Sequence, residues 1–185
     1  ADQYGKACHL SERDCSIQRK NQKIVEEAPA LNIPDEKKQE LFNLCTECCK
    51  KMKYKGAGTF EFLYKNEEFY FIEMNTRLQV EHTVSEMITN FDLVKLQIAI
   101  AAGEKLEIDQ NDISVCGHAI QCRINAEHPK TFIPSPGKIT EWGKPGGIGV
   151  RVDSHVYDGC VISPYYDALI AKICTHGSDR EEALC

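Results

Sequence analysis

The chain has no apolar run long enough to cross a membrane and no pattern typical of a secretory signal peptide. It also has no excess of positive charge. The 22 Lys and Arg residues stand against 28 Asp and Glu, a formal net charge of −6, which argues against a nucleic-acid partner unless basic residues cluster. No internal repeat or low-complexity segment is present. We therefore expect a protein without membrane or nucleic-acid partners, in the cytoplasm or, for a eukaryotic source, the mitochondrial matrix.

Cysteine is too sparse for a disulfide scaffold, at ten residues in 185. Its spacing also gives no zinc pattern, because Cys45-x-x-Cys48 has no second pair. We expect reduced cysteines that bind no metal, as in a reducing compartment. The chain is long enough for one sizeable core or two small ones.

The most informative stretch is residues 59–82, TFEFLYKNEEFYFIEMNTRLQVEH. Aromatic and branched residues on both sides of a polar tip predict an antiparallel hairpin of Phe60–Tyr64 with Phe69–Met74. If the loop has three residues, Glu61 lies opposite Glu73. Side chains so paired have Cβ atoms about 5 Å apart, where two like charges destabilise a sheet.

A divalent cation held by these carboxylates and the amide of Asn75 would compensate for that repulsion. Two alternatives remain open: a hairpin with one solvated face, or a two-residue loop, which would move Glu61 off Glu73's face. Leu63 and Phe71 on the charged face favour the floor of a pocket for a flat ligand. If the chain stays extended, one edge then carries Glu73, Asn75, Arg77, Gln79 and Glu81.

The other patterns indicate an α+β fold. Apolar residues at helical spacing predict a helix over Pro34–Met52 whose cysteines, Cys45, Cys48 and Cys49, pack in a core. Asp92 and Gly103 are suitable ends for a buried helix over Leu93–Ala102. Further predicted elements are strands at Gly117–Glu127, Ile139–Trp142, Gly149–Val152 and Ala168–Cys174, and a helix after Asp179.

The run EMNTRLQVEH resembles the biotin carboxylase component of biotin-dependent carboxylases, which has an ATP-grasp fold. Other segments share the resemblance: SERDCSIQRKNQKIVEEAPA, GAGTFEFL, GHAIQCRINAE, FIPSPGKI and YYDALIAKI. It implies that residues 1–114 are the C-terminal half of the ATP-grasp domain. Residues 115–185 are then the β-rich start of the carboxylase C-terminal domain. The chain is expected to be a fragment of a longer enzyme, inactive alone because the family's phosphate-gripping glycine-rich loop lies upstream.

The resemblance implies carboxylation of biotin by ATP and bicarbonate through carboxyphosphate, the first half-reaction of these enzymes. The cofactors are ATP, Mg²⁺ or Mn²⁺, and biotin on a carrier. Glu61, Glu73 and Asn75 would hold the metal ion. Arg77 would act in catalysis, and Glu81 would be the general base that deprotonates bicarbonate, with a pKa raised toward neutral by burial.

The remaining site residues also follow from the resemblance. Asn21 and Leu63 would contact the nucleotide, although many members carry a histidine where Asn21 stands, and Asn cannot titrate. Arg77 and Arg123 present planar forks that suit bicarbonate and a developing enolate. We expect Arg77, Glu81 and Arg123 to converge on one anion-sized space. The bicarbonate and biotin set is Lys23, Arg77, Gln79, Val80 and Arg123.

The implied partners are a biotin carboxyl carrier protein or domain, a carboxyltransferase and a second copy of the enzyme. Acetyl-CoA carboxylase, in fatty acid biosynthesis, is one such enzyme, but the acceptor is chosen outside these residues. One alternative is a non-catalytic binding or oligomerisation module of the same fold. Another is a different ATP-grasp ligase such as a carbamoyl-phosphate synthetase, against which RLQVEH and Arg123 argue.

Overall fold

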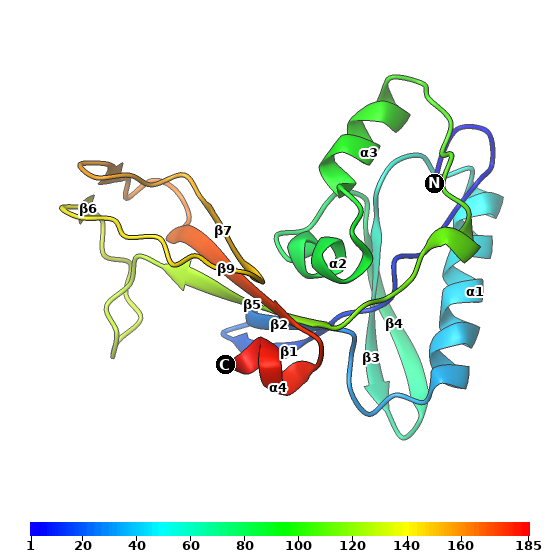
Figure 1. Cartoon of the computed structure of the whole chain (residues 1–185), viewed down its shortest axis with the longest axis horizontal. Coiled ribbons are helices and arrows are strands. Elements are labelled where there is room, and N and C mark those ends of the chain that lie inside the picture. The colour runs from blue at the N-terminus through cyan, green and yellow to red at the C-terminus, as the bar shows by residue number, and fades with distance from the viewer. The chain divides into compact units, whose positions relative to one another are not determined.

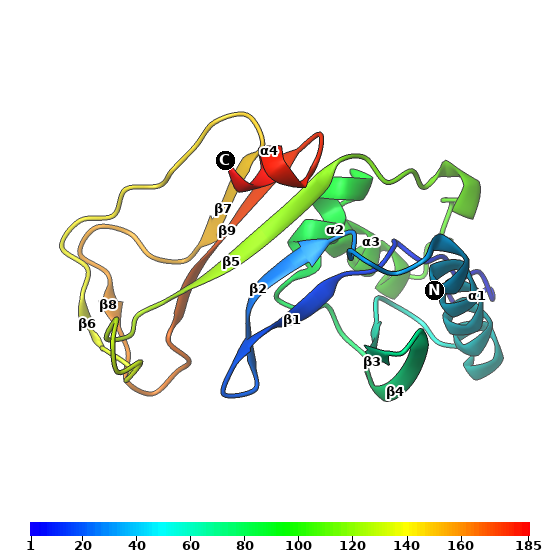
Figure 2. The same ribbon diagram turned by 90° about the horizontal axis from the view of Figure 1, so that it is seen from below.

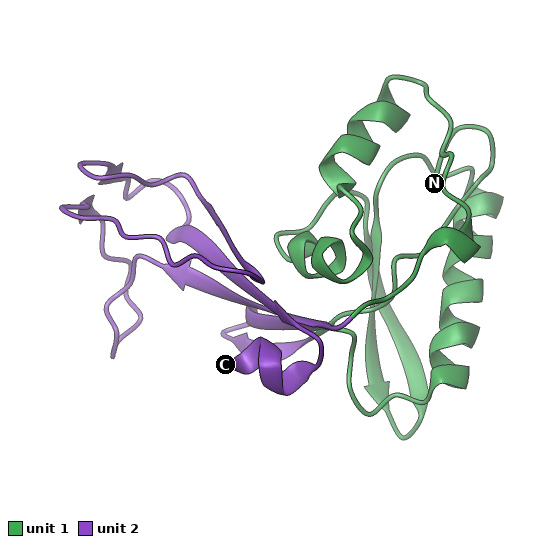
Figure 3. Cartoon of the chain, viewed as in Figure 1, with its two compact units in different colours: residues 1–14, 28–116 green, residues 15–27, 117–185 purple.

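The computed structural model describes residues 1–185, which form two compact units (Figure 3). The first contains residues 1–14 and 28–116, and the second contains residues 15–27 and 117–185. The division near residue 116 lies close to the domain boundary expected at 114, but residues 15–27 belong with the second unit. The α+β class is confirmed. No helix combines the length and the apolar character needed to cross a membrane.

The first unit contains an antiparallel hairpin and three α-helices (Figure 1). Figures 1 and 2 both show the long helix α1 running alongside the hairpin. The elements are β3 (Thr59–Lys65), β4 (Glu68–Asn75), α1 (Asp35–Met52), α2 (His82–Thr89), α3 (Leu93–Ala101) and the 3₁₀-helix η1 (Gln110–Asp112).

The hairpin turn has two residues, so the predicted three-residue loop is wrong. Asn66 and Glu67 have φ angles of 53° and 61°, the positive values that a type I′ turn requires. Lys65 consequently pairs with Glu68 and not with Phe69. The alternative of a two-residue loop is therefore correct, although Glu is uncommon at such a position.

A β-bulge restores the expected carboxylate pair. The register shifts between Glu61 and Phe62, because Phe62 pairs with Phe71 whereas Glu61 pairs with Glu73. Ile72 is therefore the extra residue of β4. The predicted facing of Glu61 and Glu73 is correct, but the bulge produces it, not the loop length.

The helix ends of the first unit follow local signals. Pro34 precedes α1, and the side chain of Asp92 caps α3 by accepting from the backbone N–H of Lys95 at 2.8 Å. The expected burial of α3 is wrong, and the α1 cysteines expected to pack in a core are only partly buried. No residue of α1 is fully buried, and in α3 only Leu93 is. Exposed apolar residues on these helices are Leu44, Met52, Val94 and Ile98.

The second unit is a five-stranded sheet of order β1-β2-β5-β9-β7 with a separate two-stranded ladder. Gly177 allows α4 to lie directly on β9 (Figure 2), since a Cβ there would stand 2.6 Å from the Ala183 nitrogen. The elements are β1 (Asp14–Arg19), β2 (Gln22–Ala28), β5 (His118–Asn125), β6 (Gly137–Lys138), β7 (Val150–Ser154), β8 (Val161–Ile162), β9 (Leu169–Gly177) and α4 (Arg180–Leu184).

The strand predicted over Ile139–Trp142 is wrong, because the ladder strand β6 lies just before it. Ile139 and Trp142 instead pack against a buried apolar cluster of Val156, Ile162 and Ile170. The other predicted strands of this half correspond to β5, β7 and β9. The predicted helix after Asp179 is α4, whose N-terminus the Asp179 carboxylate caps through the Glu182 N–H at 2.9 Å.

Candidate functional site

Two carboxylates and two amides meet where β3 and β4 pair beside the bulge. The amide nitrogen of Asn75 donates to Glu61 Oε1 at 3.1 Å and to Glu73 Oε1 at 3.0 Å. The amide nitrogen of Gln79 donates to the same Glu61 oxygen at 2.6 Å. Four of the predicted site residues therefore share one cluster, in which amide N–H groups offset part of the repulsion between the carboxylates.

The cluster suits a hard divalent cation. It presents carboxylate and amide oxygens, the ligands that Mg²⁺ uses in proteins. The Asn75 nitrogen stands between the two carboxylates, in the space where a cation would neutralise both. An ion there requires the Asn75 amide to turn its oxygen inward. The residues fit Mg²⁺ with the rest of its ligands supplied from outside the cluster.

Arg13, for which the sequence predicted no role, holds this cluster from the side. Its guanidinium donates to Gln79 Oε1 at 2.6 Å and to the hydroxyls of Thr59 at 3.2 Å and Ser85 at 3.0 Å. It thus joins the start of β3, the segment after β4 and helix α2. The Nε atom is buried and has no hydrogen-bond partner. No local pattern could reveal this role, since the partners lie 46 to 72 residues away along the chain.

The chain after Asn75 does not stay extended, which corrects the predicted edge of alternating polar residues. β4 ends at Asn75, and residues 76–81 form a loop that leads into α2. Arg77 is exposed and donates to the Leu78 carbonyl at 3.1 Å and to Asn75 Oδ1 at 3.3 Å. Gln79 and Glu81 are buried, with 6% and 2% of their surface exposed.

Glu81 is the residue just before α2, and its side chain makes no capping hydrogen bond to the helix N-terminus. Val80, the neighbouring loop residue, is partly buried. The burial on which the general-base hypothesis depends is therefore present.

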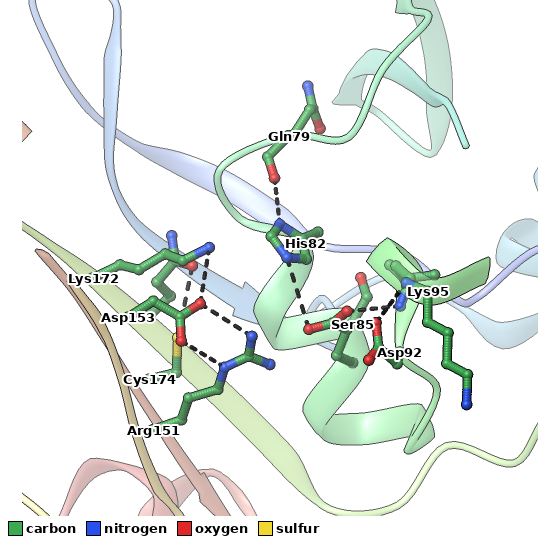
Figure 4. A network of polar contacts seen from close by, with 12 residues as sticks. Gln79, His82, Ser85, Asp92, Lys95, Arg151, Asp153, Lys172 and Cys174 are labelled. Atoms are coloured by element: carbon green, nitrogen blue, oxygen red, sulfur yellow. Dashed lines mark hydrogen bonds and ion pairs between the residues drawn. The ribbon is translucent and has the colours of Figure 1, made fainter. Parts of the chain in front are cut away.

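His82 connects this loop to the body of α2 (Figure 4). Its Nδ1 donates to the Gln79 carbonyl at 2.7 Å, and its Nε2 lies 3.8 Å from Glu86 Oε2. The other oxygen of Glu86 accepts the backbone N–H of Leu93 at 2.7 Å. The 79–82 segment is thereby tied to both α2 and α3, which gives the loop a defined conformation.

Leu63 lies on the same strand as Glu61, two residues away, and 63% of its surface is exposed. Its partner is Tyr70, so the predicted pairing with Phe71 is wrong. The ring of Phe71 packs against that of Phe62 on the opposite face, with centroids 5.7 Å apart. An apolar surface of Leu63 and Tyr70, and not of Leu63 and Phe71, adjoins the carboxylates.

The second unit contains the other predicted residues. Lys20 and Asn21 form the two-residue turn between β1 and β2, with φ angles of 50° and 62°. Asn is well suited to that backbone conformation. Lys23 lies on β2 and is partly buried. Arg123 on β5 forms an ion pair with Glu26 of β2, a residue to which the sequence assigned no role. The predicted convergence of Arg77, Glu81 and Arg123 stays a prediction.

A second ion-pair group of this unit involves Asp153 of β7 (Figure 4). The Asp153 carboxylate accepts from Arg151 Nε at 2.9 Å and lies 3.4 Å from Lys172 Nζ. Burial raises the pKa of Asp153, but the hydrogen bond from Arg151 and the two positive charges outweigh it, so that the net pKa is lowered. This carboxylate is therefore ionised at neutral pH.

None of the ten cysteines forms a disulfide, and no group of three or more His, Cys, Asp and Glu side chains is placed to hold a metal ion. Burial, with smaller contributions from Cys49 and Cys48, raises the pKa of Cys45 to about 11. Burial also raises the pKa of the partly buried Cys8 and Cys49. These thiols are poor nucleophiles and poor metal ligands at neutral pH.

Comparison with known families matches both halves of the chain. Residues 1–109 match the family described as carbamoyl-phosphate synthase L chain, ATP binding domain, and residues 121–185 match the biotin carboxylase C-terminal domain. Among curated relatives, the chain is 60% identical to the biotin carboxylase of Allochromatium vinosum and 58% identical to that of Pseudomonas aeruginosa. All of this chain is matched in each case, but only 41% of either relative.

Solved structures show the same fold. A biotin carboxylase domain of thermophilic 2-oxoglutarate carboxylase bound to bicarbonate superposes with a TM-score of 0.96 at 51% identity. The match covers 99% of this chain and 42% of that one. The Hydrogenobacter thermophilus domain dimer, in complex with MgADP, ADP and bicarbonate, gives the same TM-score and identity, with 99% and 41% covered. These matches confirm the resemblance stated from EMNTRLQVEH and the expected ATP-grasp and C-terminal carboxylase folds.

Proposed function

Because the chain belongs to the biotin carboxylase family, we propose that it serves the ATP-dependent carboxylation of biotin by bicarbonate. The single observation that carries the proposal is the Glu61–Glu73–Asn75 cluster, followed within eight residues of Glu73 by the buried Glu81. A carboxylate pair suited to a metal ion, with a buried carboxylate eight residues further along the chain, suits a reaction that needs both phosphate neutralisation and a base. The chain spans about two fifths of the curated relatives' length, so the activity is proposed for the full-length enzyme.

Glu61, Glu73 and Asn75 would hold Mg²⁺ or Mn²⁺, which when bound supplies charge neutralisation at the ATP phosphates. Arg77 stands on the exposed loop next to Asn75, where its guanidinium can bind a small anion in a bidentate manner. Gln79 and the backbone at Val80 would complete the bicarbonate site. Glu81 would accept the bicarbonate proton on a carboxylate oxygen and so make the bicarbonate oxygen nucleophilic.

The nucleotide would lie against Leu63 and Tyr70, whose exposed apolar surfaces adjoin Glu61. A flat base bound there would bury both side chains. Asn21 would hydrogen-bond the ribose or a phosphate, and Lys23 would attract bicarbonate and phosphate. Arg123 would bind bicarbonate or the ureido oxygen of biotin. In this scheme the bicarbonate oxygen attacks the γ-phosphoryl group of ATP and ADP leaves, which gives carboxyphosphate. Biotin N1′ would then lose its proton and take the carboxyl group, and phosphate would be released.

The proposed partners are a biotinylated carrier protein or domain, a carboxyltransferase and a second copy of the enzyme. Relatives named for pyruvate and 2-oxoglutarate carboxylases stand beside those named biotin carboxylase. Acetyl-CoA carboxylase and a role in fatty acid biosynthesis are therefore one of several assignments for the final acceptor.

The proposal is tested with the full-length protein by measuring phosphate release from ATP. Release should require bicarbonate and increase with free biotin, and Glu81→Gln should abolish the biotin-dependent part. Phosphate release that depends on neither bicarbonate nor biotin would contradict the proposal. The isolated 185-residue chain is expected to show no biotin-dependent ATP hydrolysis, because most of phosphoryl-transfer catalysis is positioning and charge stabilisation of the phosphates.

The match of residues 1–109 to a family described by carbamoyl-phosphate synthase supports a second candidate, a related ligase. The same assay separates the two. Formation of carbamoyl phosphate when ammonia is supplied, with no response to biotin, would favour that ligase.

A further inference from the structure

Glu26 has the most deeply buried acidic side chain in the second unit, with none of its surface exposed. Its Oε1 accepts Arg123 Nε at 2.7 Å and lies 2.6 Å from Arg123 Nη2. Its Oε2 accepts the amide nitrogen of Gln121 at 2.9 Å. The strands that bear these residues, β2 and β5, are neighbours in the sheet. Both carboxylate oxygens are therefore held from one adjacent strand.

The geometry of the strand explains the arrangement. Gln121 and Arg123 are two residues apart on β5, so their side chains project from the same face. Gln121 is itself fully buried, and its Oε1 accepts from the Cys174 thiol on β9 at 3.7 Å. A chain of contacts thus runs across three strands, from Cys174 through Gln121 and Glu26 to the guanidinium of Arg123.

A carboxylate with no exposed surface is costly to bury, so it persists only when its charge is paired and its oxygens are hydrogen-bonded. Arg123 keeps 19% of its side-chain surface exposed, whereas the side chain of Glu26 has none. Solvent therefore reaches the Arg123 side of the ion pair but not the Glu26 side. Such an arrangement fixes the plane of a guanidinium that still reaches the surface.

We propose that Glu26 is a positioning residue for Arg123, which it holds in the orientation that binds bicarbonate or the biotin ureido group. The proposal rests on the function proposed for Arg123. Two nitrogens of one guanidinium on a single oxygen restrict rotation about the end of the arginine side chain. The Glu26 charge also offsets that of Arg123, so that simple anions bind there less strongly than they would at an unpaired arginine.

The test compares Glu26→Gln with Glu27→Gln in the full-length enzyme. Glu27 is the matched control, because it is an adjacent β2 carboxylate paired with His118 Nε2 at 2.8 Å and Arg180 Nε at 2.7 Å, and not with Arg123. Glu26→Gln should lower kcat for biotin carboxylation about 10-fold or more, since misplacement of a reacting group by about 1 Å can cost 100-fold. KM for ATP should stay unchanged, and inhibition by added sulfate should become stronger. Glu27→Gln should change none of these quantities per folded molecule.

A double-mutant cycle separates positioning from general loss of structure. If Glu26 acts through Arg123, then Glu26→Gln causes no further loss of kcat in an Arg123→Gln background. An equal fold-loss in both backgrounds, or the same kcat for Glu26→Gln and Glu27→Gln, would overturn the proposal. Should Glu26→Gln not fold, Glu26→Asp keeps the charge at a shorter reach. It should lower kcat in the wild-type background alone, and wild-type kcat in this variant would contradict positioning. An inactive wild-type enzyme would instead refute the proposed function.

Discussion

Glu61 pairs directly with Glu73 in the β3–β4 hairpin because a bulge at Ile72 corrects the register that a two-residue turn sets. Without the bulge, Glu61 would lie opposite Ile72. The hairpin thus contains a β-bulge and a pair of like charges, and each of these is unfavourable for the stability of the sheet on its own. Bulges that redirect a side chain are common next to functional sites, and here the bulge places a carboxylate within reach of the Asn75 amide.

This relationship predicts that Glu73 controls the metal requirement. In the full-length enzyme, Glu73→Gln should raise the Mg²⁺ concentration needed for half-maximal activity about 10-fold or more, because a charged ligand to a hard cation is lost. The measurement is activity as a function of free Mg²⁺ at saturating ATP. Glu67→Gln, an exposed acid at the hairpin turn, is the control and should leave the curve in place. An unchanged Mg²⁺ dependence in Glu73→Gln would remove the ion from the site.

A substitution in the β3–β4 turn should increase the stability of the hairpin. Glu67 has a φ angle of 61°, a conformation that costs an L side chain about 1 kcal/mol and glycine almost nothing. Glu67→Gly should therefore raise the free energy of unfolding by about 0.5–1 kcal/mol, measured by urea denaturation. Glu67→Gln removes the same charge without changing the backbone and should have no such effect. A loss of stability in Glu67→Gly would contradict the type I′ assignment.

Several parts of the fold were predictable because their signals are local. Pro34, Asp92 and Asp179 mark helix starts that depend only on neighbouring backbone groups. The β3–β4 strands follow from aromatic and branched residues. The family assignment followed from EMNTRLQVEH, in which the order of residues is far more specific than their composition.

Other parts depend on contacts that the order of residues does not reveal. Arg13 contacts Gln79, which is 66 residues away in the sequence, and Glu26 contacts Arg123, which is 97 residues away. Neither carries a local pattern that distinguishes it from a surface charge. The burial expected for α3 failed for a related reason: the apolar content of a helix indicates what can be buried, but the amount buried depends on the elements that pack against it.

Asp2 should make the stability of the chain depend on pH. The carboxylate is buried and accepts three backbone N–H groups, those of Tyr4, Lys6 and Leu106. Burial raises its pKa, but these hydrogen bonds outweigh burial and lower it below the ordinary 3.8. The folded state therefore binds its proton less tightly than the unfolded state, so the stabilisation is present above pH 3.8 and is lost as pH falls through the lowered pKa.

Asp2→Asn tests this dependence. The variant should unfold at lower urea concentration than wild type at pH 6, and the difference should shrink as pH falls below 3.8. Asp35→Asn, at the exposed start of α1, is the control carboxylate. A difference between Asp2→Asn and wild type that stays constant from pH 6 to strongly acidic conditions would show that the charge of Asp2 contributes nothing.

The cysteines should be reduced and unequal in reactivity. Denatured protein under non-reducing conditions should titrate ten thiols, and six or fewer would contradict a reduced state. In the native protein at pH 8, a pKa of about 11 leaves roughly one Cys45 thiol in a thousand ionised. Iodoacetamide should therefore modify the exposed Cys116 and Cys185 well before Cys45, as mass spectrometry of proteolytic peptides can follow. Equally rapid labelling of Cys45 would show that its thiol is not protected by burial.

Arg77 provides the test of the anion site. It is exposed, it follows Asn75 of the carboxylate cluster by two residues, and it contacts Asn75 and Leu78. Since its guanidinium is not needed to hold the cluster together, Arg77→Ala should leave the free energy of unfolding nearly unchanged. A charge that stabilises the transition state is worth about 100- to 1,000-fold in rate. Biotin carboxylation should therefore fall by that factor while KM for ATP stays within about twofold, since neither contact involves the predicted nucleotide surface at Leu63.

Arg77→Lys separates charge from shape. Lys keeps the positive charge but lacks the planar fork that binds an anion through two parallel hydrogen bonds. If bidentate binding of bicarbonate is the role of Arg77, Lys restores only a small part of the activity and KM for bicarbonate stays high. Full recovery in Arg77→Lys would mean that charge alone matters at this position. A parallel loss of ATP affinity in Arg77→Ala would assign Arg77 to the nucleotide, and the bicarbonate role proposed for it would then be withdrawn.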